Sequence, residues 1–124
     1  GWASTKNLPI LFVVEDNNLS ILTEKKIRRN WEMHDVANGM KVESYDISDD
    51  PQSINDHLKN VFKKPILLNI NTVRKFWHAG AGTDGENFDR YKDEMNFFGN
   101  DGIEIDKYYE NLVKSAWKKQ LETL

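Results

Sequence analysis

A cluster of oxygen-bearing side chains follows the first apolar segment of the chain. Residues 10–14 are all apolar, and they run directly into Glu15, Asp16, Asn17 and Asn18. Ligands of α/β proteins bind in the crevice at the carboxyl ends of parallel strands, so this position favours a binding site. Carboxylate, amide and carbonyl oxygens suit Mg²⁺. The alternative is a simple turn, because Asp and Asn bond to their own main chain and accept left-handed backbone.

A second group of chemically active residues follows the third apolar segment. Residues 74–84 combine Arg74, Lys75 and His78 with glycines at positions 80 and 82. Basic side chains, an imidazole and open backbone N–H groups suit a diphosphate or a loop that closes over a ligand. A surface loop with its aromatic side chains packed on the core is the alternative. No helix with a third glycine follows, so a dinucleotide-binding fingerprint is not expected.

Composition narrows the class of protein. The chain has 124 residues, of which 39% are hydrophobic and 30% charged, as expected for one globular domain. Its net charge of −3 gives no electrostatic basis for a nucleic-acid partner. Cysteine is absent, which excludes disulfides and thiolate zinc sites and is compatible with the cytoplasm, where we expect the protein. The apolar runs are far shorter than the roughly 20 residues of a membrane span, so no membrane association is expected.

Hydrophobic patterning predicts alternating strands and helices. We expect strands over 10–14, 40–47 and 65–70, with helices within 23–38 and over 51–62. Continuous rather than alternating hydrophobicity in the strands indicates burial on both faces, which favours a parallel sheet covered by helices. The predicted fold is therefore α/β, a partial doubly wound sheet of three mainly parallel strands with right-handed crossover helices.

The last third of the chain predicts a separate helical tail. Helices are expected over 89–98 and 106–124, separated by a turn that begins at Gly99. We place the domain division between an α/β part at 1–86 and a helical extension at 87–124. The final helix carries an apolar stripe that needs a surface to pack on, formed by Tyr109, Leu112, Val113, Ala116 and Trp117.

Three segments carry a family resemblance. They are Trp2-Ala3 with residues 7–15, the small-residue helix end at 36–40, and the Lys-Pro strand at 64–72. With the two polar groups, they resemble the alpha subunit of the thiamine-diphosphate-dependent decarboxylating (dehydrogenase) component of 2-oxo acid dehydrogenase complexes. The resemblance spans nearly the whole chain but only the C-terminal half of such a subunit. It implies a fragment of the thiamine-diphosphate-binding fold, preceded by further residues of the parent protein.

The resemblance implies a metal site at the end of the first strand. The family's cofactor motif opens with Gly-Asp-Gly and closes with Asn-Asn, and its aspartate, an asparagine and a backbone carbonyl bind the Mg²⁺ that holds the diphosphate. Aligning Glu15 with the family's glutamate makes Glu15 a cofactor-binding residue, Asn17 the asparagine ligand and Leu19 the carbonyl ligand. Asp16 stands where the family usually has its first Asn. Gly-Asp-Gly is absent from the sequence, so only part of the site is present.

The same resemblance makes His78 a catalytic and cofactor-binding candidate. The family's His-Gly-His-Ser loop corresponds to residues 78–81, which here read His-Ala-Gly-Ala. Counting back from Asp84 aligns His78 with the first family histidine. A shifted register aligns it with the second, which faces the cofactor.

The implied activity is oxidative decarboxylation of a 2-oxo acid with thiamine diphosphate and Mg²⁺, followed by acyl transfer to a lipoyl carrier. The implied partners are a beta subunit or domain and a lipoyl acyltransferase, while the isolated chain is expected to be inactive. A fragment of this kind exposes apolar surface on its first strand and last helix, so self-association is expected. The alternatives are a non-catalytic interaction module on the same scaffold and a small stand-alone nucleotide-binding domain.

Overall fold

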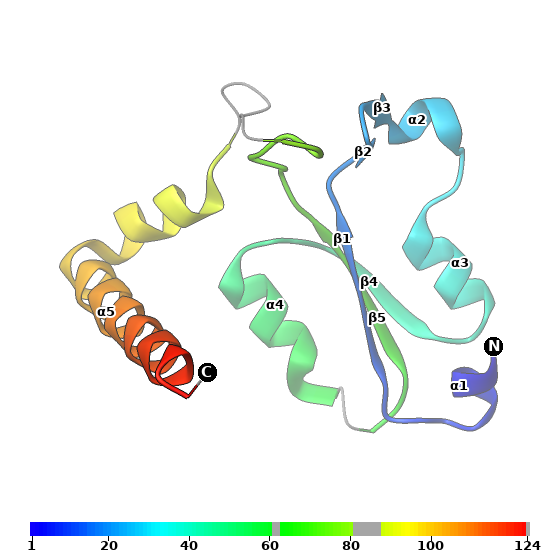
Figure 1. The fold of residues 1–124 in the computed structure, drawn as a ribbon. Helices are drawn as coiled ribbons and strands as arrows, with labels where there is room; N and C mark the ends of the chain where they lie inside the picture. The colour runs from blue at the N-terminus through cyan, green and yellow to red at the C-terminus, as the bar shows by residue number, and fades with distance from the viewer. Residues whose placement is uncertain (61–62, 81–87, 124) are drawn as a thin grey trace. The chain divides into compact units, whose positions relative to one another are not determined.

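A three-stranded parallel sheet forms the centre of the N-terminal part of the molecule (Figure 1). The computed structural model describes residues 1–60, 63–80 and 88–123. The sheet consists of β1 (Leu11–Asp16), β5 (Ile66–Asn71) and β4 (Glu43–Ser48), in that spatial order. Leu11 and Glu43 both pair with Ile66, and both registers continue in parallel to the end of β5. The predicted α/β architecture with three parallel strands is confirmed.

The last strand in the chain, β5, lies in the middle of this sheet. Its first five residues are all buried, which explains why this segment is continuously apolar apart from Asn69. Successive side chains of a strand point to opposite faces, so Ile66, Leu68 and Ile70 share one face and Leu67 lies on the other. Each face has its own apolar cluster, and β5 contributes to both.

Helices cover both faces of the sheet, as in a doubly wound fold (Figure 1). Helix α4 (Pro51–His57) and the following 3-10 turn (Leu58–Asn60) supply side chains to the cluster around Leu68. Helix α3 (Met33–Gly39) packs on the opposite face, around Leu67. The start of α4 follows from its sequence, because the Asp50 carboxylate accepts from the Ser53 N–H at 2.7 Å and Pro51 occupies the first turn.

The helix predicted over part of 23–38 is confirmed as α3 in the second half of that range, whereas the first half is not a continuous helix. The segment contains β3 (Thr23–Glu24), which pairs antiparallel with β2 (Leu19–Ser20), and then the single-turn helix α2 (Lys25–Arg28). Helical backbone stops at Arg29, whose φ of −149° and ψ of 149° are extended. The Arg29 guanidinium pairs with Asp16, a long-range contact that outweighs local helix propensity.

The C-terminal part forms a second compact unit. The chain divides into Gly1–Phe88, which begins with the short helix α1 (Trp2–Thr5), and Asp89–Leu124. Helix α5 (Arg90–Leu121) dominates the second unit and contains one non-helical residue, Gly99. A φ of 56° and ψ of −126° there require glycine, so a break at Gly99 is confirmed. Residues 100–105, which were predicted to lie between two helices, are helical instead. This confirms a C-terminal helical segment.

Strand β1 is an edge strand that carries apolar side chains on both faces. Among the described residues it pairs only with β5. Val13 is 51% exposed and Phe12 39%, although both belong to the continuous apolar run from which burial was predicted. An exposed apolar edge of this kind is a template for pairing with another strand.

Replacing Leu68 by a smaller residue tests whether the core lies around β5. Its side chain is 1% exposed on the central strand, so replacing Leu68 by Ala should lower the free energy of unfolding by about 3 kcal/mol through lost burial and a residual cavity. The matched control is Val13→Ala on the edge strand, which should cost less than about 1 kcal/mol. Urea denaturation followed by circular dichroism measures both, and equal losses would contradict a core centred on β5.

Candidate functional site

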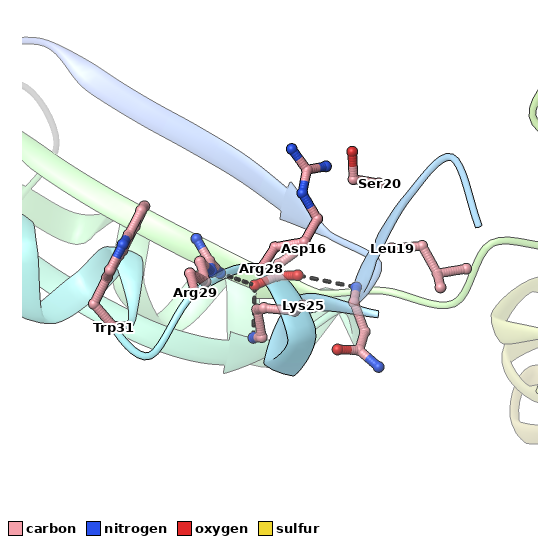
Figure 2. A pocket seen from close by; sticks show the side chains of 8 residues that line it. Asp16, Leu19, Ser20, Lys25, Arg28, Arg29 and Trp31 are labelled. Carbon is pink, nitrogen blue, oxygen red and sulfur yellow. Dashed lines mark hydrogen bonds and ion pairs between the residues drawn. The ribbon is translucent and has the colours of Figure 1, made fainter. Parts of the chain in front are cut away.

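The last residue of β1, Asp16, is the centre of an ion-pair cluster (Figure 2). Its Oδ2 accepts hydrogen bonds from Lys25 Nζ at 2.8 Å and Arg29 Nη2 at 2.9 Å. Its Oδ1 accepts from the backbone N–H of Asn18 at 2.9 Å. The side chain is only 9% exposed, so two cations and a main-chain donor hold a largely buried carboxylate in a fixed position.

Burial raises the pKa of the Asp16 carboxyl, but its partners outweigh burial. The hydrogen bonds from Lys25 and the Asn18 N–H, followed by the charges of Lys25 and Arg29, hold this pKa below its usual value. The hydrogen bond to Asp16 raises the pKa of Lys25 in turn, although burial opposes the change. Both groups are therefore charged at neutral pH.

The turn and hairpin after β1 return the chain so that the two cations, Lys25 and Arg29, lie beside Asp16. Asn17 Oδ1 accepts from the Leu19 N–H at 3.0 Å, and Asn18 adopts a left-handed φ of 61°. These turns lead into the β2–β3 hairpin, which returns the chain so that the Lys25 N–H donates to the Asn18 carbonyl at 2.9 Å. Helix α2 then begins beside the end of β1. The polar residues 16–18 thus form both a turn and a charged site.

A second carboxylate and an indole complete the cluster. The Oε2 atom of Glu32 lies 3.1 Å from Lys25 Nζ and 3.6 Å from Arg29 Nη2. The Arg29 guanidinium lies over the Trp31 ring, 4.6 Å from its centroid, in a cation–π contact. The Arg29 side chain is therefore fixed by a carboxylate at its end and an aromatic ring along its plane.

A pocket of about 240 Å³ opens beside this cluster (Figure 2). It is lined mainly by the hairpin, α2 and the residues that follow α2. The lining residues are Asp16, Asn18, Leu19, Ser20, Lys25, Arg28, Arg29 and Trp31. The pocket therefore combines cationic side chains, a hydroxyl group and an aromatic surface at the carboxyl end of a parallel strand, the position where α/β folds bind ligands.

Three of the four residues predicted to bind the cofactor, Glu15, Asn17 and Leu19, lie at this strand end, but the four do not converge. Glu15 is exposed and shares its sheet face with Ile70, opposite to the Asp16 side chain. Asn17 and Leu19 are partly buried in the turn and hairpin. His78 is exposed in a turn, and no described contact joins it to the other three residues.

One hydrogen bond links the two polar segments of the sequence. Arg74 Nη1 donates to the Ile21 carbonyl at 2.6 Å, which brings the segment after β5 to the β2–β3 hairpin. Residues 81–84 of the second polar segment lie outside the described residues, whereas 78–80 are described and exposed. The contact places the second polar segment beside the first.

The described residues do not form a complete metal site by themselves. They contain no group of three or more His, Asp or Glu side chains arranged to hold an ion. Asn17 Oδ1 already accepts the Leu19 N–H, although an amide oxygen has a second lone pair. Further ligands from elsewhere are needed to complete the coordination of Mg²⁺, which prefers an octahedral set of oxygens.

Sequence reasoning missed the partners of Asp16. Lys25 and Arg29 follow Asp16 at separations of nine and thirteen residues, and no local pattern in the sequence pairs them with it. The available signal was a continuously apolar strand ending in a carboxylate, because a carboxylate that becomes buried requires a cation nearby.

Comparisons with known proteins identify no relative. No family model, curated protein or solved structure matches the chain. Among the described residues, no helix has the length and hydrophobicity needed to cross a bilayer. Functional inference therefore depends on the motifs and on the geometry of this site.

Replacing Asp16 by Asn tests the ion-pair cluster through pH. The variant leaves Lys25 and Arg29 without their shared carboxylate, so its free energy of unfolding at pH 7 should fall by about 2 kcal/mol. Because folding lowers the pKa of Asp16, this stabilisation is complete above the unfolded-state value, near 3.8. It is lost as the pH falls through the lower folded-state pKa, so the two proteins should converge in acid.

Glu15→Gln is the matched control for this measurement. It removes one carboxylate from the neighbouring exposed position of the same strand, and urea denaturation at several pH values should show little change. A difference between Asp16→Asn and the native chain that persists unchanged in strong acid would contradict the assignment.

Proposed function

We propose that this chain is the C-terminal half of a thiamine-diphosphate-dependent 2-oxo acid dehydrogenase alpha subunit and supplies half of its Mg²⁺-diphosphate site. The observation that carries the proposal is the placement of Asn17 and Leu19 directly after the carboxyl end of a parallel edge strand. Another parallel strand beside β1 would bring its own carboxyl end next to Asn17. The missing aspartate ligand would then come from that strand.

In the proposed site, each residue has a separate task. The Asn17 amide oxygen and the Leu19 carbonyl would bind Mg²⁺, and Glu15 would support the bound cofactor. The Asp16 ion pairs hold the turn in place, so that less conformational entropy is lost on binding. Thiamine diphosphate supplies the nucleophilic carbon for decarboxylation of a 2-oxo acid. His78 would act at the mouth of the site, brought near by the Arg74 contact.

Exposed apolar surface supports the need for protein partners. Phe12 and Val13 on β1 are exposed, as are Leu112 and Trp117 on α5. Large apolar side chains left exposed on a strand or a helix are typical of surfaces that another protein segment covers. In the proposed enzyme, the rest of the alpha subunit, a beta subunit and a lipoyl acyltransferase would cover such surfaces, in the cytoplasm.

The same surface also favours a second candidate, a non-catalytic interaction module on this scaffold. The two candidates differ in whether Asn17 is needed for Mg²⁺-dependent cofactor binding. Release of CO₂ from a 2-oxo acid by the whole protein that contains this chain would exclude the second candidate.

Asn17 variants of that whole protein provide the sharpest test. Asn17→Ala should weaken Mg²⁺-dependent binding of thiamine diphosphate by about tenfold or more, measured by isothermal titration calorimetry, because one ligand is lost. Asn17→Asp should retain binding, since it keeps both an oxygen ligand and an acceptor for the Leu19 N–H.

Asn55→Ala on the exposed surface of α4 is the control for a general effect on stability. If Asn17→Ala binds the cofactor as tightly as the native protein does, Asn17 is not a metal ligand. Absence of a Gly-Asp-Gly segment before residue 1 in the whole protein would also count against the catalytic proposal.

A further inference from the structure

The pocket beside Asp16 carries more positive charge than its carboxylates neutralise. Three cationic side chains line it, and Asp16 is the one carboxylate among its lining residues. Glu32 pairs with Lys25 from outside the lining. Counting both carboxylates, one positive charge remains, and it belongs to Arg28.

Arg28 is the side chain that is available to a ligand. Asp16 and Glu32 engage Lys25 and Arg29, whereas Arg28 forms no ion pair within residues 1–60, 63–80 and 88–123. Figure 2 shows its guanidinium extending away from the Asp16 carboxylate, toward the side on which Ser20 lies. Ser20 is exposed and adds a hydroxyl donor to the lining. A guanidinium and a hydroxyl together suit an oxyanion.

We propose that this pocket binds the phosphate group of a small phosphorylated molecule, with Arg28 and Ser20 as donors and Trp31 as the surface for its apolar or planar part. Arg28 offers paired N–H donors that match two phosphate oxygens. Lys25 and Arg29 raise the positive potential and are already fixed by Asp16, so they lose little further freedom when an anion binds.

The size and position of the pocket narrow the ligand class. Its volume of about 240 Å³ is below the 300–1,000 Å³ typical of drug-sized ligands, so it suits a phosphate with a small body rather than a dinucleotide. Trp31 is 46% exposed and offers an aromatic surface at the rim. Arg74, bound to the Ile21 carbonyl, adds a further cation beside the hairpin.

This site shares Leu19 with the proposed metal site but uses other groups. The metal site would take the main-chain carbonyl of Leu19, whereas the phosphate pocket needs neither Mg²⁺ nor Asn17, which is not among its lining residues. A phosphate titration in the presence of a chelator therefore tests this proposal alone, and failure of either proposal leaves the other standing.

The experiment is a titration of the chain with pyrophosphate and inorganic phosphate in EDTA, followed by the backbone and indole N–H signals in NMR spectra. We expect saturable shifts at residues 18–20 and at the Trp31 indole, whose signal is assigned with Trp31→Phe. Arg28→Ala should weaken pyrophosphate binding by about tenfold, the effect of losing one charge-assisted contact. Arg28 is exposed and makes no ion pair, so this variant should fold as the native chain does.

Lys26→Ala is the matched control, because it removes the same charge two residues away. Lys26 is exposed, pairs with Glu24 at 2.7 Å and does not line the pocket, so its loss should change affinity by less than about twofold. Equal losses in the two variants, acetate binding as tightly as phosphate, or shifts that do not saturate would each overturn the proposal. Arg28→Lys should bind with intermediate affinity, since it keeps the charge but not the paired donors.

Discussion

The central position of β5 is the constraint on which the rest of the N-terminal unit depends. This strand lies between β1 and β4, and its side chains form part of the apolar clusters on both faces of the sheet. Strands β1 and β4 do not pair with each other, so the sheet has no continuous hydrogen-bond ladder until residues 66–71 are in place between them. The stability of the sheet therefore depends on contacts between residues that are far apart in the sequence. Helices α3 and α4 can pack only when β5 supplies the surface beneath them.

A second constraint joins the sheet to the site. The Asp16 carboxylate is largely buried at the end of β1, and a buried charge is costly unless cations and hydrogen bonds compensate. Lys25 and Arg29 satisfy it only if the chain turns back through the β2–β3 hairpin and leaves helical backbone at Arg29. The shape of the pocket thus follows from the need to neutralise one carboxylate. Fixed cations remain beside the pocket. Its lining is completed by Arg28 of α2, which forms no ion pair among the residues that the structure describes.

Much of the fold was predictable, whereas the centre of the site was not. Apolar segments identified all three strands of the sheet, and Asp50-Pro51 and Gly99 identified a helix start and a helix break, because those features are local. The first half of 23–38 shows the limit of local patterning. Its apolar spacing is compatible with a helix, but the hairpin and the break at Arg29 depend on a carboxylate thirteen residues earlier. Likewise, the apolar pattern alone predicted burial of Phe12 and Val13. The exposed apolar surface on this strand was expected only from the family resemblance to a fragment.

The exposed edge and the incomplete metal site have the same physical explanation if another strand lies beside β1. A neighbouring parallel strand would satisfy the free backbone groups of β1 and cover Phe12 and Val13. Its carboxyl end would also lie beside Asn17, where further oxygen ligands are needed for Mg²⁺. Neither requirement bears on the phosphate pocket, which faces the hairpin and α2 and already has its donors. The end of β1 thus combines a proposed metal half-site that depends on added structure with a proposed anion pocket whose lining comes from this chain alone.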